Sequence, residues 1–523
     1  MKRPGMFFAA AGLALALGAA ACSSGGAPSS PSGSGSSSPA GPVNRTFTYD
    51  TTAPVMDDGW DPATEYSDAI IAMSNMYETL TRYDPATHKV GPLLATSWSS
   101  SKNGLTWTFH LRQGVKFHTG RPLTAQAAKA AIDRTIKLAG GAAYVWDAVK
   151  SISTPDTGTL VFHLKYPSPL DLEASADYSA YIYDTKAAGG GSLAKWFNTP
   201  HDAGTGPYTV QTWNKGQEFE VTQTQFPGYW GGWTGSHFTK VVYRVVPQDT
   251  TSVQLLRSGQ VSFVEQMAPA LWESLRGAPG ISLVSAASWQ NLLGQLNAKT
   301  LSLPQRQAIL YGINYDGIVA ALKGAATLPS GLVPDGLFGH FGSTSLPNYK
   351  YDPAQAKQMI KQAGAAGQTV IMATSPTYSA TIVQAIQADI QAVGLNVKIQ
   401  STDQATYLQK VQSPSHNWGS IRFGQWSCSC LDADGVAYPL FHTGTIWSSY
   451  SNPAFDQLVE KARETLAPAT RDSLYAQAYG ILAKDVPGIG LFQIDAIYGA
   501  STKLQWKPDA QQDFFVADMK LSS

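Results

Sequence analysis

The segment from Trp426 to Gly435 concentrates side chains that can take part in chemistry. It holds two thiols, Cys428 and Cys430, and His442 follows it. Cysteine and histidine are suitable ligands for soft metal ions, and a thiolate beside an imidazole can act as a nucleophile. Two cysteines at i and i+2 are weak evidence for a metal site, however, and nothing sets a thiol–imidazole geometry. We therefore expect neither a metal site nor a catalytic thiol here.

Two carboxylates, Asp432 and Asp434, end the same segment in the pattern D-x-D-G. This pattern is well short of the twelve-residue loop that binds calcium. Two interpretations stay open: the carboxylates bind a polar group of a ligand, or they cap the turn that follows. The sequence contains neither H-E-x-x-H nor G-x-S-x-G, and we expect no enzyme activity and no cofactor.

Apolar alternation and turn residues predict the strands and helices of the chain, beginning with residues 105–140. Residues 105–111 alternate apolar and polar side chains, which predicts a strand with one buried face. A second short strand is expected at residues 115–117. Thr124 can then cap a helix that ends at Gly140.

Strands and helices continue to alternate along the chain, which indicates an α/β protein. Further strands are expected at residues 46–49, 160–165, 240–246, 261–264, 395–400 and 488–492. Further helices are expected at residues 67–80, 249–257, 381–393 and 471–485, and after Asp352-Pro353 and Asn452-Pro453.

Composition excludes some classes of partner. The 523 residues carry 37 basic and 37 acidic side chains, and only 14% are charged, so we expect no nucleic-acid partner. Aromatic residues make up 11% of the chain, a surplus that suits a protein enclosing an organic ligand. Nothing indicates an oligomer, and we expect a monomer.

The N-terminus has the layout of an export signal. Lys2 and Arg3 precede an apolar run, and the small residues before Cys22 resemble a lipoprotein cleavage site. We expect a signal peptide at residues 1–21 and a lipidated tether at residues 22–44, although an ordinary signal peptide with a stray cysteine is the alternative. Residues 23–42 are only Ser, Gly, Pro and Ala, and their mean reach is about 25 Å.

An exported chain meets oxidising conditions, so a bond between Cys428 and Cys430 is chemically reasonable. The small ring that it would close is strained. Free thiols and a metal pair are the alternatives.

A long motif resembles the signature of the family 5 extracellular solute-binding proteins, the dipeptide-, oligopeptide- and nickel-binding components of ABC importers. Further segments resemble the same family: Tyr77 to Leu80, Gly204 to Tyr208 and Tyr229-Trp230. Residues 292–297 resemble a strand of the family that ends in Asn, so a strand is expected there too. The motif is matched by Pro92, Leu93, Ala95, Trp98, Phe109, Leu111, Arg112, Gly114, Val115, Lys116, Phe117, His118, Gly120, Pro122, Thr124 and Ala125.

This resemblance implies an α/β fold like the type II periplasmic binding proteins, with two lobes joined by a hinge and an additional domain on the N-terminal lobe. It implies that residues 45–80, 205–285 and 492–523 form domain I and residues 81–204 the additional domain II. Residues 286–491 would form domain III, the second lobe.

The resemblance also implies a ligand site. In peptide-binding relatives, an Asp three residues after a Trp pairs with the α-amino group of the peptide. Trp426 aligns with that Trp and Asp432 with a second family Asp, but Ser429 takes the amine-binding position. Either Asp432 or Asp434 binds the amine, or the ligand lacks one. Trp60 and Tyr66 follow a family loop at the mouth of the cleft, with core packing as the alternative.

We therefore expect a substrate-binding lipoprotein on the outer face of the cell membrane. It would capture a di- or oligopeptide by lobe closure and deliver it to the permease subunits of an ABC importer. The alternative ligand is an oligosaccharide, an opine-like compound or a metal chelate. A secreted hydrolase is a more distant alternative, because it needs a nucleophile and a base within hydrogen-bond reach.

Overall fold

The computed structural model divides the chain into two units, Met1–Asn44 and Arg45–Ser523, and every described residue belongs to the second. The structure describes residues 45–51, 59–66, 69–84, 87, 89–215, 219–234, 237–265, 267–328, 331–337, 350–427 and 432–522. The expected signal peptide, tether and lipidation site Cys22 lie outside the described residues, and so do Cys428, Ser429 and Cys430.

An 11-stranded sheet is the main element of the fold. Its order is β15-β14-β16-β12-β17-β11-β1-β10-β9-β8, and β13 pairs with β17 beside this path. Several neighbouring strands, such as β17 and β11, are far apart in the sequence, so the connections between consecutive strands cross over other strands of the sheet. The strands are β1 (Thr46–Thr51), β8 (Tyr208–Asn214), β9 (Glu220–Gln225), β10 (Lys240–Val245), β11 (Phe263–Glu265), β12 (Ile281–Leu296), β13 (Ala326–Thr327), β14 (Thr369–Thr374), β15 (Asn396–Ser401), β16 (Ile421–Ser427) and β17 (Gly488–Ser501).

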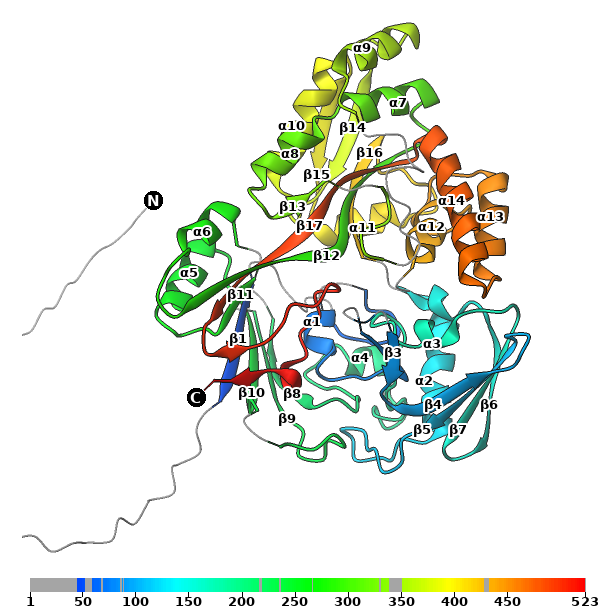
Figure 1. The fold of residues 1–523 in the computed structure, drawn as a ribbon, viewed down its shortest axis with the longest axis vertical. Helices are drawn as coiled ribbons and strands as arrows, with labels where there is room; N and C mark the ends of the chain where they lie inside the picture. The colour runs from blue at the N-terminus through cyan, green and yellow to red at the C-terminus, as the bar shows by residue number, and fades with distance from the viewer. Residues whose placement is uncertain are drawn as a thin grey trace, which may run out of the picture. The chain divides into compact units, whose positions relative to one another are not determined.

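The two longest strands, β12 with 16 residues and β17 with 14, join two lobes. Figure 1 shows them continuing from lobe 1, which holds β1 and β8–β11, into lobe 2, which holds β14–β16. Their antiparallel register breaks between Ala287 and Asn291. At this break the Ser288 hydroxyl donates to the Ile494 carbonyl at 2.7 Å, and the Gln493 side chain donates to the Ser288 carbonyl at 2.8 Å. The irregular step therefore lies where both strands pass between the lobes.

A separate four-stranded sheet has the order β4-β5-β7-β6. The predicted strand at 105–111 is confirmed as β5, whose alternation buries Trp107 and Phe109. The helix capped by Thr124 is confirmed too, because the Thr124 hydroxyl accepts a hydrogen bond from the Ala127 amide at 3.1 Å. The strand predicted at 115–117 is wrong, since that stretch makes only an isolated bridge. These elements are β4 (Ala95–Ser100), β5 (Thr106–Leu111), α2 (Ala125–Leu138), η1 (Ala143–Trp146), β6 (Val149–Asp156) and β7 (Thr159–Leu164).

The helix predicted at 67–80 is wrong for most of its length, because α1 covers only Ile70–Met73. After α1 the backbone carbonyls accept hydrogen bonds from other segments instead of continuing a helix. The Met76 carbonyl accepts from the Gly206 amide at 2.9 Å, and the Glu78 carbonyl accepts from the Ile182 amide at 2.9 Å. A Cβ atom at Gly204 would lie 1.9 Å from the Met76 carbonyl oxygen, so only glycine permits this close approach.

The other helices predicted from the sequence are present, as α5, α9, α10, α13 and α14. The predicted bounds of α5 are confirmed, and α14 begins three residues before the prediction, at Pro468. The strands predicted at 292–297 and 488–492 are the ends of β12 and β17. The helices are α3 (Leu170–Glu173), α4 (Leu193–Trp196), α5 (Asp249–Arg257), α6 (Pro269–Ser274), α7 (Leu303–Gly312), α8 (Tyr315–Ala321), α9 (Pro353–Gln362), α10 (Ala380–Ala392), α11 (Gln404–Val411), α12 (Asp434–Phe441), α13 (Pro453–Arg463) and α14 (Pro468–Asp485).

Two short strand pairs and one helical turn complete the described secondary structure: β2 (Thr81–Asp84) with β3 (Lys89–Pro92), β18 (Leu504–Gln505) with β19 (Lys520–Leu521), and η2 (Val516–Asp518). Over the described ranges, no helix has the length and apolar character needed to cross a membrane.

Candidate functional site

A cavity of about 830 Å³ lies between the lobes, at the carboxyl ends of parallel strands. In lobe 1, β1 runs parallel to β10 and β11, and β11 ends at Glu265. In lobe 2, β14 runs parallel to β15 and β16 and ends at Thr374. Both end residues line the cavity. Ligands of open α/β sheets bind outside such strand ends, and the volume suits an organic molecule.

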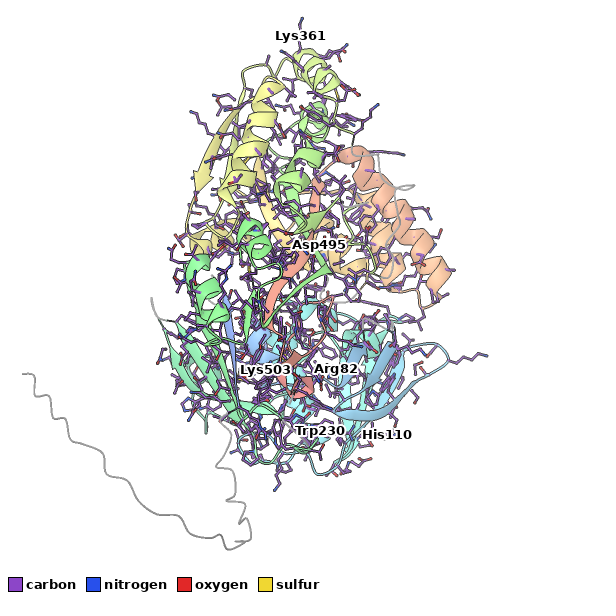
Figure 2. All side chains as sticks on the ribbon, turned by 60° about the vertical axis from the view of Figure 1, so that its left-hand side comes forward. Arg82, His110, Trp230, Lys361, Asp495 and Lys503 are labelled. Atoms are coloured by element: carbon purple, nitrogen blue, oxygen red, sulfur yellow. The ribbon has the colours of Figure 1, made fainter. Side chains whose placement is uncertain are left out.

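The cavity carries acidic groups. Glu265 is only 4% exposed, and its Oε2 has no hydrogen-bond partner among the described residues. Burial raises the pKa of Glu265 to about 8. Asp495 also lines the cavity, and burial raises its pKa. Figure 2 shows Asp495 on β17, between the lobe with Lys361 and the lobe with Lys503.

The described residues that line this cavity include no Lys, Arg or His. The other polar groups are hydroxyls and amides, among them Ser375, Thr377, Gln425 and Gln512. The described lining therefore offers single hydrogen-bonding groups and carboxyl groups, but no cation.

Two of the predicted site residues, Tyr66 and Trp426, meet at Trp447, outside the lining of this cavity. The rings of Tyr66 and Trp447 lie 5.8 Å apart, and those of Trp426 and Trp447 lie 5.5 Å apart, both edge to face. We call Tyr66, Trp426 and Trp447 the aromatic cluster. The Gln412 side chain donates to the Tyr66 hydroxyl at 2.8 Å, and the Trp426 indole donates to the Gly435 carbonyl at 2.7 Å. Since Tyr66 precedes α1 and the two tryptophans belong to lobe 2, the cluster bridges the lobes.

Trp60 lies elsewhere. Its side chain is fully buried, its ring lies 4.2 Å from that of Trp213, and its indole donates to the His201 carbonyl at 2.6 Å. This is the core packing that the sequence left open as the alternative to a cleft position.

Asp432 and Asp434 are buried and paired with arginines. The Arg471 guanidinium donates to Asp432 at 2.6 and 3.1 Å, and Arg463 donates to Asp434 at 3.1 Å. The Tyr475 hydroxyl also donates to Asp434, at 2.9 Å. Burial raises the pKa of Asp432, against the opposing effect of Arg471.

Asp432 also accepts a hydrogen bond from the Asp434 amide at 2.8 Å, at the start of α12. Asp432 therefore accepts the first amide of α12, and the ion pairs of both carboxylates hold α12 against α13 and α14. This arrangement gives no support to either of them as the partner of a ligand amine.

Arg422 is a further buried charge, beside the aromatic cluster. It lies two residues before Gly424 on β16, and the alternation of that strand places it on the same face as Trp426. Its guanidinium donates to the Trp447 carbonyl at 2.9 Å, while its Nε has no partner within the described part of the chain. Burial lowers its pKa.

Sequence reasoning missed Glu265, Trp447 and Arg422. An acid at the carboxyl end of a predicted strand was a usable signal for Glu265, because such strand ends form ligand sites. No comparable signal marks Trp447 or Arg422. No group of three or more His, Cys, Asp or Glu side chains is placed to hold a metal ion in the described ranges.

Comparisons with known proteins agree with this geometry. Residues 89–448 match the family model described as bacterial extracellular solute-binding proteins, family 5 middle. The glutathione-binding protein GsiB of Salmonella typhi is 26% identical over 502 residues, which cover 88% of this chain and 96% of the relative. The dipeptide-binding protein of Escherichia coli K12 is 25% identical over 455 residues, covering 79% of this chain and 83% of the relative.

Solved structures share the fold. The binding protein DppA from Helicobacter pylori, in complex with the peptide STSA, superposes with a TM-score of 0.82 at 24% identity, covering 92% of this chain and 99% of that one. The binding protein AgaA from A. tumefacien R10, in complex with agropinic acid, gives a TM-score of 0.79 at 22% identity, covering 91% and 99%.

Proposed function

This chain belongs to the family 5 bacterial extracellular solute-binding proteins, the substrate-binding components of ABC importers, and we propose that it is a lipoprotein that captures a di- or oligopeptide. Its α/β fold, expected from the sequence, is that of the type II periplasmic binding proteins, with two lobes and a hinge. The relatives are transport proteins rather than enzymes.

The cavity between the end of β11 and the end of β14 is the observation that carries the ligand proposal. A peptide needs many separate hydrogen-bonding groups along its backbone and a carboxylate for its amino group. The hydroxyls, amides and acids of the cavity provide both kinds of group. A ligand that touches both lobes favours their closed arrangement, which the permease subunits of the importer then recognise.

A non-peptide ligand is the second candidate, and the aromatic cluster favours it. Sugars stack on aromatic rings, and Tyr66, Trp426 and Trp447 offer three of them where the two lobes meet. AgaA, which shares this fold, was solved in complex with agropinic acid, a ligand that is not a peptide. The pairing of Asp432 and Asp434 with arginines points the same way, because it removes two acids that a peptide amine would use.

Anchoring by lipid on Cys22 is part of the proposal, and the Ser- and Gly-rich segment after it supports a tether. The protein would then act as a monomer on the outer face of the cell membrane. We also propose the domain division expected from the sequence, with residues 81–204 as the additional domain of the first lobe.

Two measurements test the ligand class. Native mass spectrometry of the purified mature protein should detect a co-purified peptide as a discrete mass increment. Titration calorimetry of ligand-free protein with di- to pentapeptides should give saturable heat for at least one length. If every peptide fails while an opine or an oligosaccharide binds, the second candidate is correct.

A further inference from the structure

Glu265 is an unusual group in the cavity between the lobes. It is the last residue of β11, it is 4% exposed, and its Oε2 contacts no donor among the described residues. A buried carboxylate without a partner is costly, so such a group usually meets a cation, a donor or a proton.

The described protein groups do not supply that cation. No Lys, Arg or His occurs among the described lining residues, and no ion pair of Glu265 is present over the same ranges. Asp495 adds a second acid to the lining, so the local field favours a positive charge.

Asp432 and Asp434, the two buried carboxylates that the sequence singled out, are already neutralised. Asp432 pairs with Arg471, and Asp434 with Arg463 and Tyr475. Glu265 therefore differs from both in facing the cavity without an arginine.

Gln512 is a second sign that this part of the cavity is built for binding. It lines the cavity, and its φ of 68° lies in the left-handed region, which is uncommon for a residue other than glycine. Strained backbone of this kind clusters at ligand sites because the surrounding fold holds it in place.

We propose that Glu265, at the end of β11 in lobe 1, binds the positively charged group of the ligand, an α-ammonium in the case of a peptide. This inference rests on the proposed peptide-binding function. The ammonium donates charge-assisted hydrogen bonds to the carboxylate, and any proton that the carboxyl group held is released to solvent.

Titration calorimetry of the ligand-free protein tests the subsite with three probes: trialanine, N-acetyl-trialanine and agmatine. Wild type should bind trialanine at least tenfold more tightly than the acetylated peptide, which has no ammonium. Glu265→Gln keeps the side-chain shape but removes the charge, so it should weaken trialanine at least tenfold and bind the acetylated peptide as wild type does. Glu273→Gln, at an exposed glutamate of α6 paired with Arg276, is the matched control and should behave as wild type.

The outcomes separate the two proposals. If trialanine and its acetylated form bind equally well, or if Glu265→Gln binds trialanine as wild type does, the subsite is wrong and the peptide function stands. If only agmatine binds, and Glu265→Gln abolishes its binding, the subsite is correct and the peptide function is wrong. Wild-type protein that binds none of the three probes overturns the subsite, and the di- to pentapeptide panel then decides the peptide function.

Discussion

His118 and Asp202 form a buried ion pair that fastens the signature segment to the turn before β8. The imidazole Nδ1 contacts Asp202 Oδ1, and Nε2 lies 2.9 Å from the Gly206 carbonyl oxygen. Because both nitrogens face acceptors, the ring donates from both and is positively charged. Asp202 also accepts from the Val210 amide and the Thr209 hydroxyl, each at 2.8 Å.

Removing the imidazole should be strongly destabilising. We expect His118→Asn to lower the free energy of unfolding by about 3–5 kcal/mol, since it leaves the buried Asp202 charge without its partner. Urea unfolding at pH 6, followed by tryptophan fluorescence, measures the change. The control is His110→Asn on β5, at an exposed histidine labelled in Figure 2, which should be near neutral. Equal effects of the two substitutions would contradict the structural role of the pair.

Stability should fall as pH rises from 5 to 8. Burial raises the pKa of Glu78 to about 7, against hydrogen bonds from Trp230, Thr205 and Tyr229. The folded state therefore binds more protons than the unfolded state between roughly pH 4.5 and 7, and linkage makes stability decrease through that window. Burial opposes the charge of His118, but Asp202 holds its pKa above the ordinary value, so that contribution too is lost at higher pH.

Thermal unfolding of the ligand-free protein at pH 5 and pH 8 checks this prediction. We expect a midpoint lower by at least a few degrees at pH 8, because about 1 kcal/mol moves the midpoint of a large domain by roughly 2 °C. Glu78→Gln should reduce the pH dependence, as it removes one titrating group. Below about pH 4 Asp202 acts in the opposite direction: burial raises its pKa, but His118 holds the pKa below the ordinary value, so protonation of Asp202 destabilises the folded state.

The elements that the sequence predicted well are those whose signals are local. Asn452 caps α13 by accepting from the Ala454 and Phe455 amides, and this depends on residues only two or three positions away. The predicted helix at 67–80 failed because distant amides, such as that of Gly206, compete for the backbone carbonyls of that segment.

The site was harder to predict for the same reason. Trp426 and Tyr66 were named from the family resemblance, and the structure brings both to Trp447. Trp60 also follows the family loop, yet its burial depends on Trp213 in a strand far along the chain. The neutralisation of Asp432 depends on Arg471 of α14, which no spacing rule connects to it.

The pair of Asp432 and Arg471 should matter for stability and not for the ligand. We expect Asp432→Asn to cost about 3–5 kcal/mol of unfolding free energy, because it leaves Arg471 buried and uncompensated. The double variant Asp432→Leu with Arg471→Met should recover most of this loss, since a buried pair is often replaceable by apolar side chains. Chemical denaturation of the three proteins gives the comparison. Peptide affinity of Asp432→Asn should stay within about threefold of wild type, and a larger loss would restore Asp432 as a ligand contact.

Tyr66 should contribute to lobe closure. An edge-to-face aromatic contact is worth about 0.5–1.5 kcal/mol, so Tyr66→Ala should weaken ligand binding by up to roughly tenfold. The side chain is 36% exposed, and we expect the thermal midpoint to change little. Tyr351→Ala, at a tyrosine that is 41% exposed, is the matched control and should retain wild-type affinity. If Tyr66→Ala binds the ligand as tightly as wild type does, the aromatic cluster does not contribute to lobe closure.

Binding of an ammonium ligand should strengthen with pH over the range in which the protein loses stability. Burial raises the pKa of Glu265 to about 8, so in the empty cleft the carboxyl group holds a proton at neutral pH. Asp495 is the other carboxyl group of the described lining. Tyr498 of β17 is the ionisable residue paired with Glu265 of β11. An ammonium favours the ionised form, so binding releases about one proton, and affinity should rise about tenfold per pH unit between pH 6 and 7.

Calorimetry with trialanine in phosphate and in Tris buffer counts the released proton, since the two buffers differ in heat of ionisation. In Glu265→Gln both the proton release and the pH dependence of affinity should disappear. Because the unfolding equilibrium moves in the opposite direction with pH, a thermal shift would mix the two effects, whereas direct titration separates them. If the affinity of the wild-type protein does not change between pH 6 and 7, Glu265 does not release a proton when the ligand binds.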